Sequence, residues 1–182
     1  MLMAADKSVL LVVDVQERLL PAIHDGETIL ANCIWLAGVA RRLRVPVVVS
    51  EQYPAGLGPT AAPLKAVLDG AHYVDKTHFS CVSDGCLAGT EVEARRQVIV
   101  VGTEAHVCVL QTVLELRWQG KEVFVVADAV GSRKPADKEL ALARMRAHGV
   151  EVVSREMVAF EWLKRSATAQ FREINQDFIR DN

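Results

Sequence analysis

The sequence of 182 residues has little that would tie it to nucleic acid or to a membrane. Its 21 basic and 23 acidic residues leave a net charge of -2, and no segment gathers Lys or Arg into a stripe that could follow a phosphate backbone. No apolar run approaches the roughly 20 residues that span a bilayer. The segment MLMAADKSVLLVVDVQ lacks the charged start and the cleavage site of a signal peptide. We therefore expect a cytoplasmic protein that binds neither nucleic acid nor a membrane.

Cysteine is sparse as well. The four cysteines stand at positions 33, 81, 86 and 108, and their spacing matches neither CxxC pairs nor a disulfide-rich secreted protein. We expect reduced thiols. Cys33 lies on the apolar stripe of an expected helix and Cys81 is read in the same way, as ordinary packing, because cysteine is among the most buried residue types. Cys86, beside Gly85 in an expected loop, is open to either a packing or a chemical role.

The sequence also lacks a recognisable phosphate-binding loop and a recognisable cluster of metal ligands. No GxGxxG follows the first expected strand, where VDVQERL stands instead, and no P-loop is present. A nucleotide-binding Rossmann-like protein therefore stays only as a weak alternative. His78 with Cys81 and Cys86 has an unusual spacing for zinc and lacks a fourth ligand. We expect no metal and no cofactor.

What the sequence does have is an apolar fraction of 51%, enough for a sizeable core, and a length that fits one domain over residues 1–182. Short runs rich in Val and Leu predict six strands, and segments with apolar residues at spacings of three and four predict the helices between them. The expected strands are 8–13, 46–50, 72–75, 97–101, 122–127 and 150–153. The expected helices are 27–44, 61–68, 107–119 and 135–148, with a helical segment inside 77–96 and a C-terminal tail, about 156–182, that is helical throughout.

Strands that alternate with helices at this rhythm favour a three-layer α/β/α fold. The fold class expected is a doubly wound, Rossmann-like, six-stranded and mainly parallel sheet with helices on both faces. In such sheets, ligands bind beyond the carboxyl ends of the strands, at the point where the strand order reverses. These ends are therefore the places to look for functional residues.

Three reactive side chains stand at expected strand ends. Asp14 follows the first strand, Lys76 follows the third, and Cys108 follows the fourth after the turn GTEAHV, at the start of a helix. A helix N-terminus and a nearby ammonium both shift a thiol toward thiolate, and a carboxylate can accept the thiol proton. Taken singly, each residue has an ordinary structural explanation, so the prediction depends on their convergence. His106 offers a competing Cys/His scheme that spacing alone leaves open.

Several segments resemble one known family across nearly the whole chain. They are LLVVDVQERL, VDKTHFSC, VIVVGTEAHVCVLQT, VVADAVGSR and RMRAHGVEVVS. In order and spacing the chain resembles the isochorismatase-like cysteine hydrolases, which include nicotinamidases and N-carbamoylsarcosine amidohydrolases. The segments GTEAHVCV and SEQYPAGLGPT are most similar to the branch of isochorismatase domain-containing proteins.

The resemblance implies a mechanism for the three residues. Asp14 would act as the base, Lys76 as the positive partner, and Cys108 as the nucleophile that forms a thioester, which water then hydrolyses. The backbone N–H of Cys108 and the turn before it would form the oxyanion hole. The family's non-proline cis peptide would fall between Thr103 and Glu104.

Departures from the family bear on the substrate. Nicotinamidases carry a metal-binding DxH motif after the second strand, whereas this chain has Glu51, Gln52, Tyr53 and Pro54 there, which argues against a zinc-assisted nicotinamidase. Enzymes that cleave the vinyl ether of isochorismate typically lack the cysteine, which is present here. We therefore expect a metal-independent hydrolase that cleaves a C–N bond, amide or carbamoyl, of a small and partly apolar molecule.

The surroundings of the site and the state of assembly are predicted in less detail. The residues expected to line the substrate pocket are Gln16, Tyr53, Leu57, Phe79 and His106. The apolar stripe of the tail, Phe171, Ile174 and Phe178, has no further strand to cover, so we expect a homo-oligomer, dimer or higher, in which a partner subunit covers it. The alternative is a catalytically idle scaffold that acts as a binding or assembly module.

Overall fold

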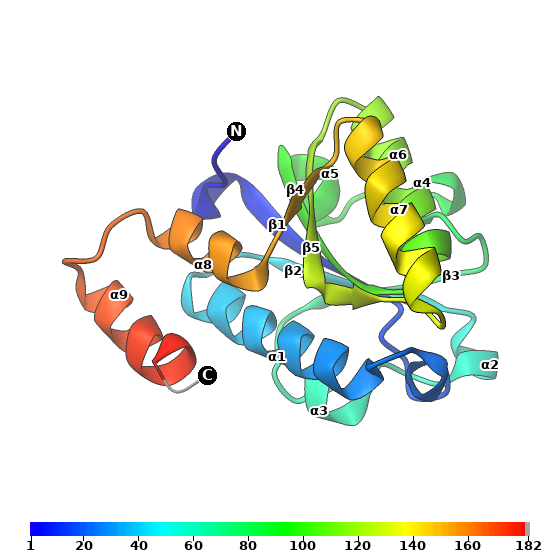
Figure 1. Cartoon of the computed structure of the whole chain (residues 1–182), viewed down its shortest axis with the longest axis horizontal. Helices are drawn as coiled ribbons and strands as arrows, with labels where there is room; N and C mark the ends of the chain where they lie inside the picture. The colour runs from blue at the N-terminus through cyan, green and yellow to red at the C-terminus, as the bar shows by residue number, and fades with distance from the viewer. Residues whose placement is uncertain (181–182) are drawn as a thin grey trace.

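The protein, described over residues 1–180 by a computed structural model, is built on one six-stranded sheet with helices on both faces (Figure 1). The strands lie in the order β3-β2-β1-β4-β5-β6, and all neighbouring pairs are parallel. This confirms the expected doubly wound α/β/α fold. The strands are β1 (Ser8–Val13), β2 (Val47–Gln52), β3 (His72–Lys76), β4 (Gln97–Thr103), β5 (Glu122–Gly131) and β6 (Glu151–Val153).

The helices form two layers, one on each face of the sheet (Figure 1). One layer holds α1 (Gly26–Arg42), α3 (Ala62–Lys65), α8 (Arg155–Leu163) and α9 (Ala169–Ile174), and the other holds α4 (Cys81–Asp84), α5 (Glu91–Ala94), α6 (Leu110–Trp118) and α7 (Pro135–Ala147). The short α2 (Pro54–Leu57) follows β2. Single turns of other helix types are η1 (Ala5–Lys7), η2 (Leu20–Ala22), η3 (Ala105–Val109) and η4 (Asn175–Ile179).

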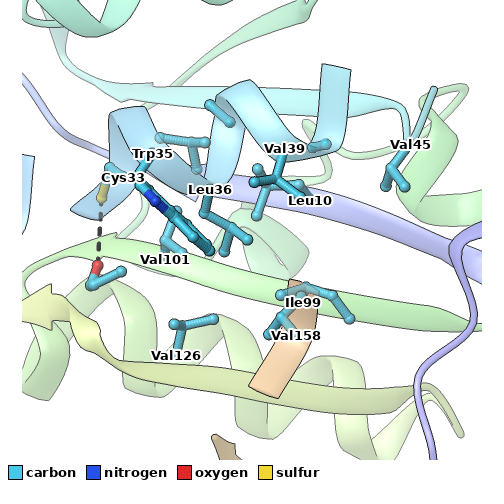
Figure 2. Close-up of a cluster of buried hydrophobic side chains, with 14 of the residues drawn as sticks. Leu10, Cys33, Trp35, Leu36, Val39, Val45, Ile99, Val101, Val126 and Val158 are labelled. Carbon is cyan, nitrogen blue, oxygen red and sulfur yellow. Dashed lines mark hydrogen bonds between the residues drawn. The ribbon is translucent and has the colours of Figure 1, made fainter. Parts of the chain in front are cut away.

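The central strands β1 and β4 are buried along their whole length because both of their faces are covered. In β1, Leu10 and Val12 belong to the core under α1 and α8, whereas Val9, Leu11 and Val13 belong to the core under α6 and α7. Figure 2 shows the first of these cores, in which side chains of α1 meet those of the sheet. Buried apolar side chains on both faces therefore hold β1 in place, and with it the strand end that carries Asp14.

The strand order reverses between β1 and β4, so the chain departs in opposite directions from two adjacent strand ends. The register pairs Val13 with both Ser50 and Gly102. The backbones approach very closely there, since a Cβ on Gly102 would lie 2.0 Å from the Val13 carbonyl oxygen, and Gly102 has a φ of +123°. Only glycine fits such a position. The carboxyl ends of β1 and β4 are thus held side by side at the switch point.

The C-terminal tail is not helical throughout, so that prediction was wrong. Helix α8 ends at Leu163 because Lys164 adopts a left-handed conformation, with a φ of 62°. Residues 164–168 are not helical, and Thr168 then caps α9 by accepting a hydrogen bond from the Phe171 N–H. The last part of the predicted tail, residues 181–182, lies outside the described residues. Helix 61–68 was also predicted too long, because only Ala62–Lys65 is helical.

The apolar stripe of the tail is covered by the chain itself. Ile174 is fully buried in the core beneath α1, and the ring of Phe178 packs edge-on against Trp35. A Cβ on Gly38 would lie 2.6 Å from the Phe178 ring, so a glycine makes room for it. The expectation that a partner subunit covers this stripe was therefore wrong, because α1 already does so. Among residues 1–180, no helix is both long enough and apolar enough to cross a membrane.

Candidate active site

A buried ion pair lies at the carboxyl edge of the sheet. The Lys76 ammonium is 2.8 Å from Asp14 Oδ2, and neither side chain has any solvent exposure. The Ser50 hydroxyl, placed beside Asp14 by the pairing of Val13 with Ser50, donates to Asp14 Oδ1 at 2.7 Å. Burial raises the pKa of the Asp14 carboxyl, and the Lys76 ammonium and the Ser50 hydroxyl oppose part of that rise. A carboxylate with a raised pKa is a stronger base than an ordinary one.

The thiol of Cys108 meets the same carboxylate. Cys108 lies in η3, immediately after β4, and is 5% exposed. Its Sγ lies 3.9 Å from Gln52 Oε1, which is itself 2.5 Å from the Lys76 ammonium, and the negative charge of Asp14 acts on the thiol. The structure thus brings together Asp14, Lys76 and Cys108, the three residues singled out from strand ends.

The protonation of Cys108 differs from the expectation. Burial and the negative charge of Asp14 raise the pKa of the thiol, and the opposing effect of Lys76 is smaller. The expected shift toward thiolate was wrong for the resting site, because loss of water and a neighbouring carboxylate outweigh the ammonium. A thiol in this state needs a proton acceptor before it can serve as a nucleophile.

Gln52 is a site residue that sequence reasoning missed. Strand β2 runs to Gln52, beyond the predicted end at residue 50, and the register pairs Gln52 with Lys76. Gln52 Oε1 accepts a hydrogen bond from Lys76 Nζ at 2.5 Å. A glutamine after a strand carries no chemical signal of its own, so only the strand register could have revealed it.

The turn after β4 contains a cis peptide bond between Thr103 and Glu104, at the position that the family resemblance implies. The Thr103 hydroxyl donates to the carbonyl oxygen of Asp14 at 2.7 Å. Glu104 accepts a hydrogen bond from the Arg133 guanidinium at 2.5 Å. The turn is thereby tied to both β1 and the segment after β5, and its role as an oxyanion hole stays a prediction.

The predicted pocket residues fall into two groups. Gln16 is fully buried, and its amide bonds the backbone of Gln52 and Gly58. Tyr53 and Phe79 are 59% and 54% exposed, next to the ends of β2 and β3, and Leu57 is half-buried. The Tyr53 N–H donates to the Lys76 carbonyl oxygen at 2.9 Å. These exposed rings lie at the edge of the sheet that carries Lys76, and their contact with substrate stays a prediction.

His106 has other partners than the thiol. Its Nδ1 lies 2.9 Å from the Ser132 hydroxyl, and its Nε2 lies 3.9 Å from Asp137. The hydrogen-bond partner of the Cys108 thiol is instead Gln52 Oε1, and the charge that acts most strongly on the thiol is that of Asp14. The geometry therefore favours Asp14 over His106 as the proton acceptor.

The other cysteines differ in their surroundings. Cys33 is fully buried and donates to the Ala129 carbonyl oxygen at 3.4 Å (Figure 2), and burial raises the pKa of its thiol to about 12. Cys81 is also fully buried, but its thiol interacts with Ser50, Asp14 and Lys76. Cys86 is half-buried, and its Sγ lies 3.5 Å from the Cys81 carbonyl oxygen. Over residues 1–180, no three His, Cys, Asp or Glu side chains come together in a way that could hold a metal ion.

The raised pKa of Cys108 makes a prediction about its alkylation. The rate at which iodoacetamide labels Cys108 is expected to climb from pH 7 to pH 10 without a plateau near neutrality, because only the thiolate reacts. Peptide mass spectrometry at each pH measures the rate for each cysteine. In the control variant Asp14→Asn, which removes the neighbouring negative charge, the profile should move to lower pH. A wild-type plateau below pH 8 would contradict the raised pKa.

Comparison with known proteins agrees with the fold. A model of the isochorismatase domain matches residues 8–157. Isochorismatase domain-containing protein 2A of Mus musculus is 37% identical over 174 residues, which cover 94% of this chain and 82% of that protein.

Two solved structures are also similar. One is the MAR1 ribonuclease of Caenorhabditis elegans, with a TM-score of 0.91 and 36% identity over 97% of this chain and 91% of that one. The other is the YcaC gene product of Escherichia coli, an octameric hydrolase of unknown specificity, with a TM-score of 0.91 and 23% identity over 100% of this chain and 92% of that one. At this identity YcaC supports the fold alone. Because the domain match and the murine relative span most of the chain, this protein belongs to the isochorismatase family.

Proposed function

We propose that the protein is a cysteine hydrolase that cleaves an amide or carbamoyl C–N bond of a small molecule through a thioester on Cys108. The observation that carries the proposal is that the buried Asp14–Lys76 ion pair and the Cys108 thiol gather around one atom, Gln52 Oε1, which lies 2.5 Å from Lys76 Nζ and 3.9 Å from Cys108 Sγ. A nucleophile, a base and a fixed positive charge thereby meet at the strand switch point, where ligands bind in folds of this kind.

In the first half of the reaction, the Cys108 thiol passes its proton to Asp14 as the sulfur attacks the carbonyl carbon of the substrate. The carbonyl oxygen becomes an oxyanion, for which the Cys108 N–H and the turn at Thr103 and Glu104 are the proposed donors. Asp14, now protonated, gives its proton to the nitrogen of the leaving group. The C–N bond breaks, the amine leaves, and the acyl group remains on sulfur as a thioester.

In the second half, Asp14 is again a carboxylate and accepts a proton from a water molecule, whose oxygen attacks the thioester carbon. The C–S bond then breaks, the acid product leaves, and the proton returns to the sulfur. Lys76 stays charged throughout and holds Asp14 in place. The raised pKa of Asp14 suits both proton transfers, because a base works best when its pKa lies near the working pH.

Tyr53, Leu57 and Phe79 are the proposed pocket rim for a small, partly apolar substrate. The ring of Tyr53 lies against Gly56, where a Cβ would come within 2.5 Å of it, and the Gly56 carbonyl accepts a hydrogen bond from Arg18 at 2.9 Å. The loop that bears Tyr53 and Leu57 is thus held by contacts on both sides. Rings on a held loop favour the recognition of an apolar substrate group.

The name of the nematode relative raises RNA as an alternative substrate. Binding of a phosphodiester needs cations that are free to contact it. The cation in this site, Lys76, already donates to Asp14, Gln52 and the His78 carbonyl, and the net charge of the chain is -2. These features favour a neutral amide, so we propose neither an RNA substrate nor a membrane partner.

We also propose a cytoplasmic homo-oligomer, dimer or higher. Large apolar side chains outside the tail stripe are exposed, among them Trp118 at 73%, Leu140 at 70% and Phe160 at 44%. Such side chains are common in surfaces that a partner subunit covers. A molar mass of one chain in light scattering would contradict the oligomer.

The proposed mechanism is tested by trapping the acyl-enzyme. Wild-type protein is mixed with p-nitrophenyl acetate, an activated acyl donor, and separately with a panel of amides, carbamoyl compounds and nicotinamide, then quenched in acid and mapped by mass spectrometry. We expect the acyl group on Cys108, released by hydroxylamine as thioesters are. An acyl group on Cys81, whose thiol interacts with the same ion pair, would contradict the assignment of the nucleophile. Absence of any adduct and any turnover would favour the idle scaffold.

A further inference from the structure

The Lys76 ammonium has no hydrogen-bond donor left over. An ammonium carries three N–H donors. Those of Lys76 point to Asp14 Oδ2 at 2.8 Å, to Gln52 Oε1 at 2.5 Å and to the His78 carbonyl oxygen at 3.3 Å. Of these partners, Asp14 is the charged one and Gln52 supplies the only neutral side-chain oxygen.

Gln52 is itself held in one orientation. Its Nε2 donates to the Thr77 carbonyl oxygen at 2.9 Å, which turns Oε1 toward Lys76 and leaves it 3.9 Å from Cys108 Sγ. If the Gln52 amide were flipped, its N–H groups would face the Lys76 ammonium and its oxygen would face the Thr77 carbonyl oxygen. The hydrogen-bond partners therefore fix which atom is oxygen.

The backbone of Gln52 is clamped by a second glutamine. Gln16 Oε1 accepts from the Gln52 N–H at 2.8 Å, and Gln16 Nε2 donates to the Gln52 and Gly58 carbonyl oxygens at 3.0 and 2.7 Å. Gln16 has no solvent exposure. A fully bonded, buried carboxamide thus holds a second carboxamide against the ammonium, at the base of the loop that carries Tyr53.

The acidic residue next to Gln52 faces away from the ion pair, so the side-chain oxygen that reaches Lys76 from this strand end is a neutral one. Glu51 precedes Gln52 but turns away from the ion pair, because its Oε1 accepts from the N–H and the hydroxyl of Thr60 at 2.6 and 2.7 Å. A carboxylate at position 52 would share Lys76 with Asp14 and place a negative charge beside the attacking sulfur. A neutral acceptor leaves the ammonium's charge to Asp14 and to the sulfur.

We propose that Gln52 is a positioning residue, which holds one N–H donor of the Lys76 ammonium and thereby sets how readily the Cys108 thiol ionises. The proposal deepens the proposed hydrolase function and rests on it for its effect on turnover. Its effect on ionisation, however, is a property of the resting site and is measured without any substrate.

Two substitutions are expected to change that ionisation in opposite directions. Gln52→Glu adds a negative charge near the sulfur and should slow alkylation of Cys108 by iodoacetamide at pH 8 about tenfold, which corresponds to one pKa unit. Gln52→Met removes the carbonyl dipole and frees one donor of Lys76 to turn toward the thiolate, so alkylation at pH 8 should be about threefold faster. A residue with only a structural role would not produce shifts of opposite sign.

The measurement is the alkylation rate of Cys108 between pH 7 and pH 10, followed by peptide mass spectrometry, with urea unfolding as a check that each variant is folded. Gln119→Glu and Gln119→Met are the matched controls. Gln119 is exposed, so these variants make the same two chemical changes away from the site. Profiles of the Gln52 variants that match wild type, or that move in the same direction, would overturn the proposal. Opposite shifts in a protein that never forms an acyl-enzyme would uphold the positioning role and refute the hydrolase function instead.

Discussion

Replacement of Cys108 by alanine is expected to lower turnover of an amide substrate by about four orders of magnitude or more, because the first step loses its nucleophile. The Asp14–Lys76 pair does not depend on the sulfur, so the variant should keep its fold. Initial rates on a substrate identified from the amide and carbamoyl panel measure the effect, with circular dichroism as the check on folding.

The matched control is Cys86→Ala. It removes the same atom from a half-buried cysteine that lacks contact with Asp14, and it should retain nearly wild-type turnover. Cys108→Ser is informative as well, because a hydroxyl in the same place is a far weaker nucleophile and should leave little activity. Turnover by Cys108→Ala within about tenfold of wild type would remove Cys108 from the mechanism.

Replacement of Lys76 by methionine is expected to cost about 3 to 5 kcal/mol of the free energy of unfolding, because the Asp14 carboxylate would then be buried without its cation. Both side chains of the pair are fully shielded from water. Urea unfolding at pH 7 measures the loss, and Lys7→Met, at an exposed lysine, is the control with the same change of side chain.

The loss should depend on pH in a defined direction. Without Lys76, the pKa of Asp14 in the folded protein rises further above its unfolded value, so the folded state takes up a proton as the pH falls. The stability deficit of Lys76→Met should therefore shrink from pH 7 toward pH 5. The double variant with Asp14→Asn, which removes both charges, should recover much of the stability at pH 7. A double variant no more stable than Lys76→Met would contradict this account.

Much of the fold could be predicted because the strands are continuous apolar runs. A strand covered on both faces, such as β1, has nothing polar until it reaches its end, so the first charged residue marks the carboxyl edge. This is why Asp14 could be located from sequence, whereas β3 is mostly exposed and Lys76 was located only as the residue at which that strand ends. The carboxyl edge of a parallel sheet then brings residues far apart in the chain to one place.

What could not be predicted depends on pairing between strands and on burial. The proposed role of Gln52 arises from the strand register that sets it opposite Lys76. Glutamine belongs to no sequence motif here that would have predicted this role. The protonation of Cys108 was predicted with the wrong sign, since helix position was visible in the sequence and desolvation was not. The end of the helix at Lys164 was missed because the helical spacing of apolar residues continues past Lys164, although the helix itself does not.

The division between buried machinery and exposed rim has a consequence for how such proteins diverge. Asp14, Ser50, Gln52 and Lys76 are locked by the sheet register, and a change in any one disturbs the others. Tyr53 and Phe79 stand largely in water, where substitution has little effect on stability. Under the proposed function, substitutions at these exposed positions would change which molecule is accepted, one residue at a time, while the proposed reacting groups stay as they are. Descendants of one ancestor can in this way come to act on different molecules with the same chemistry.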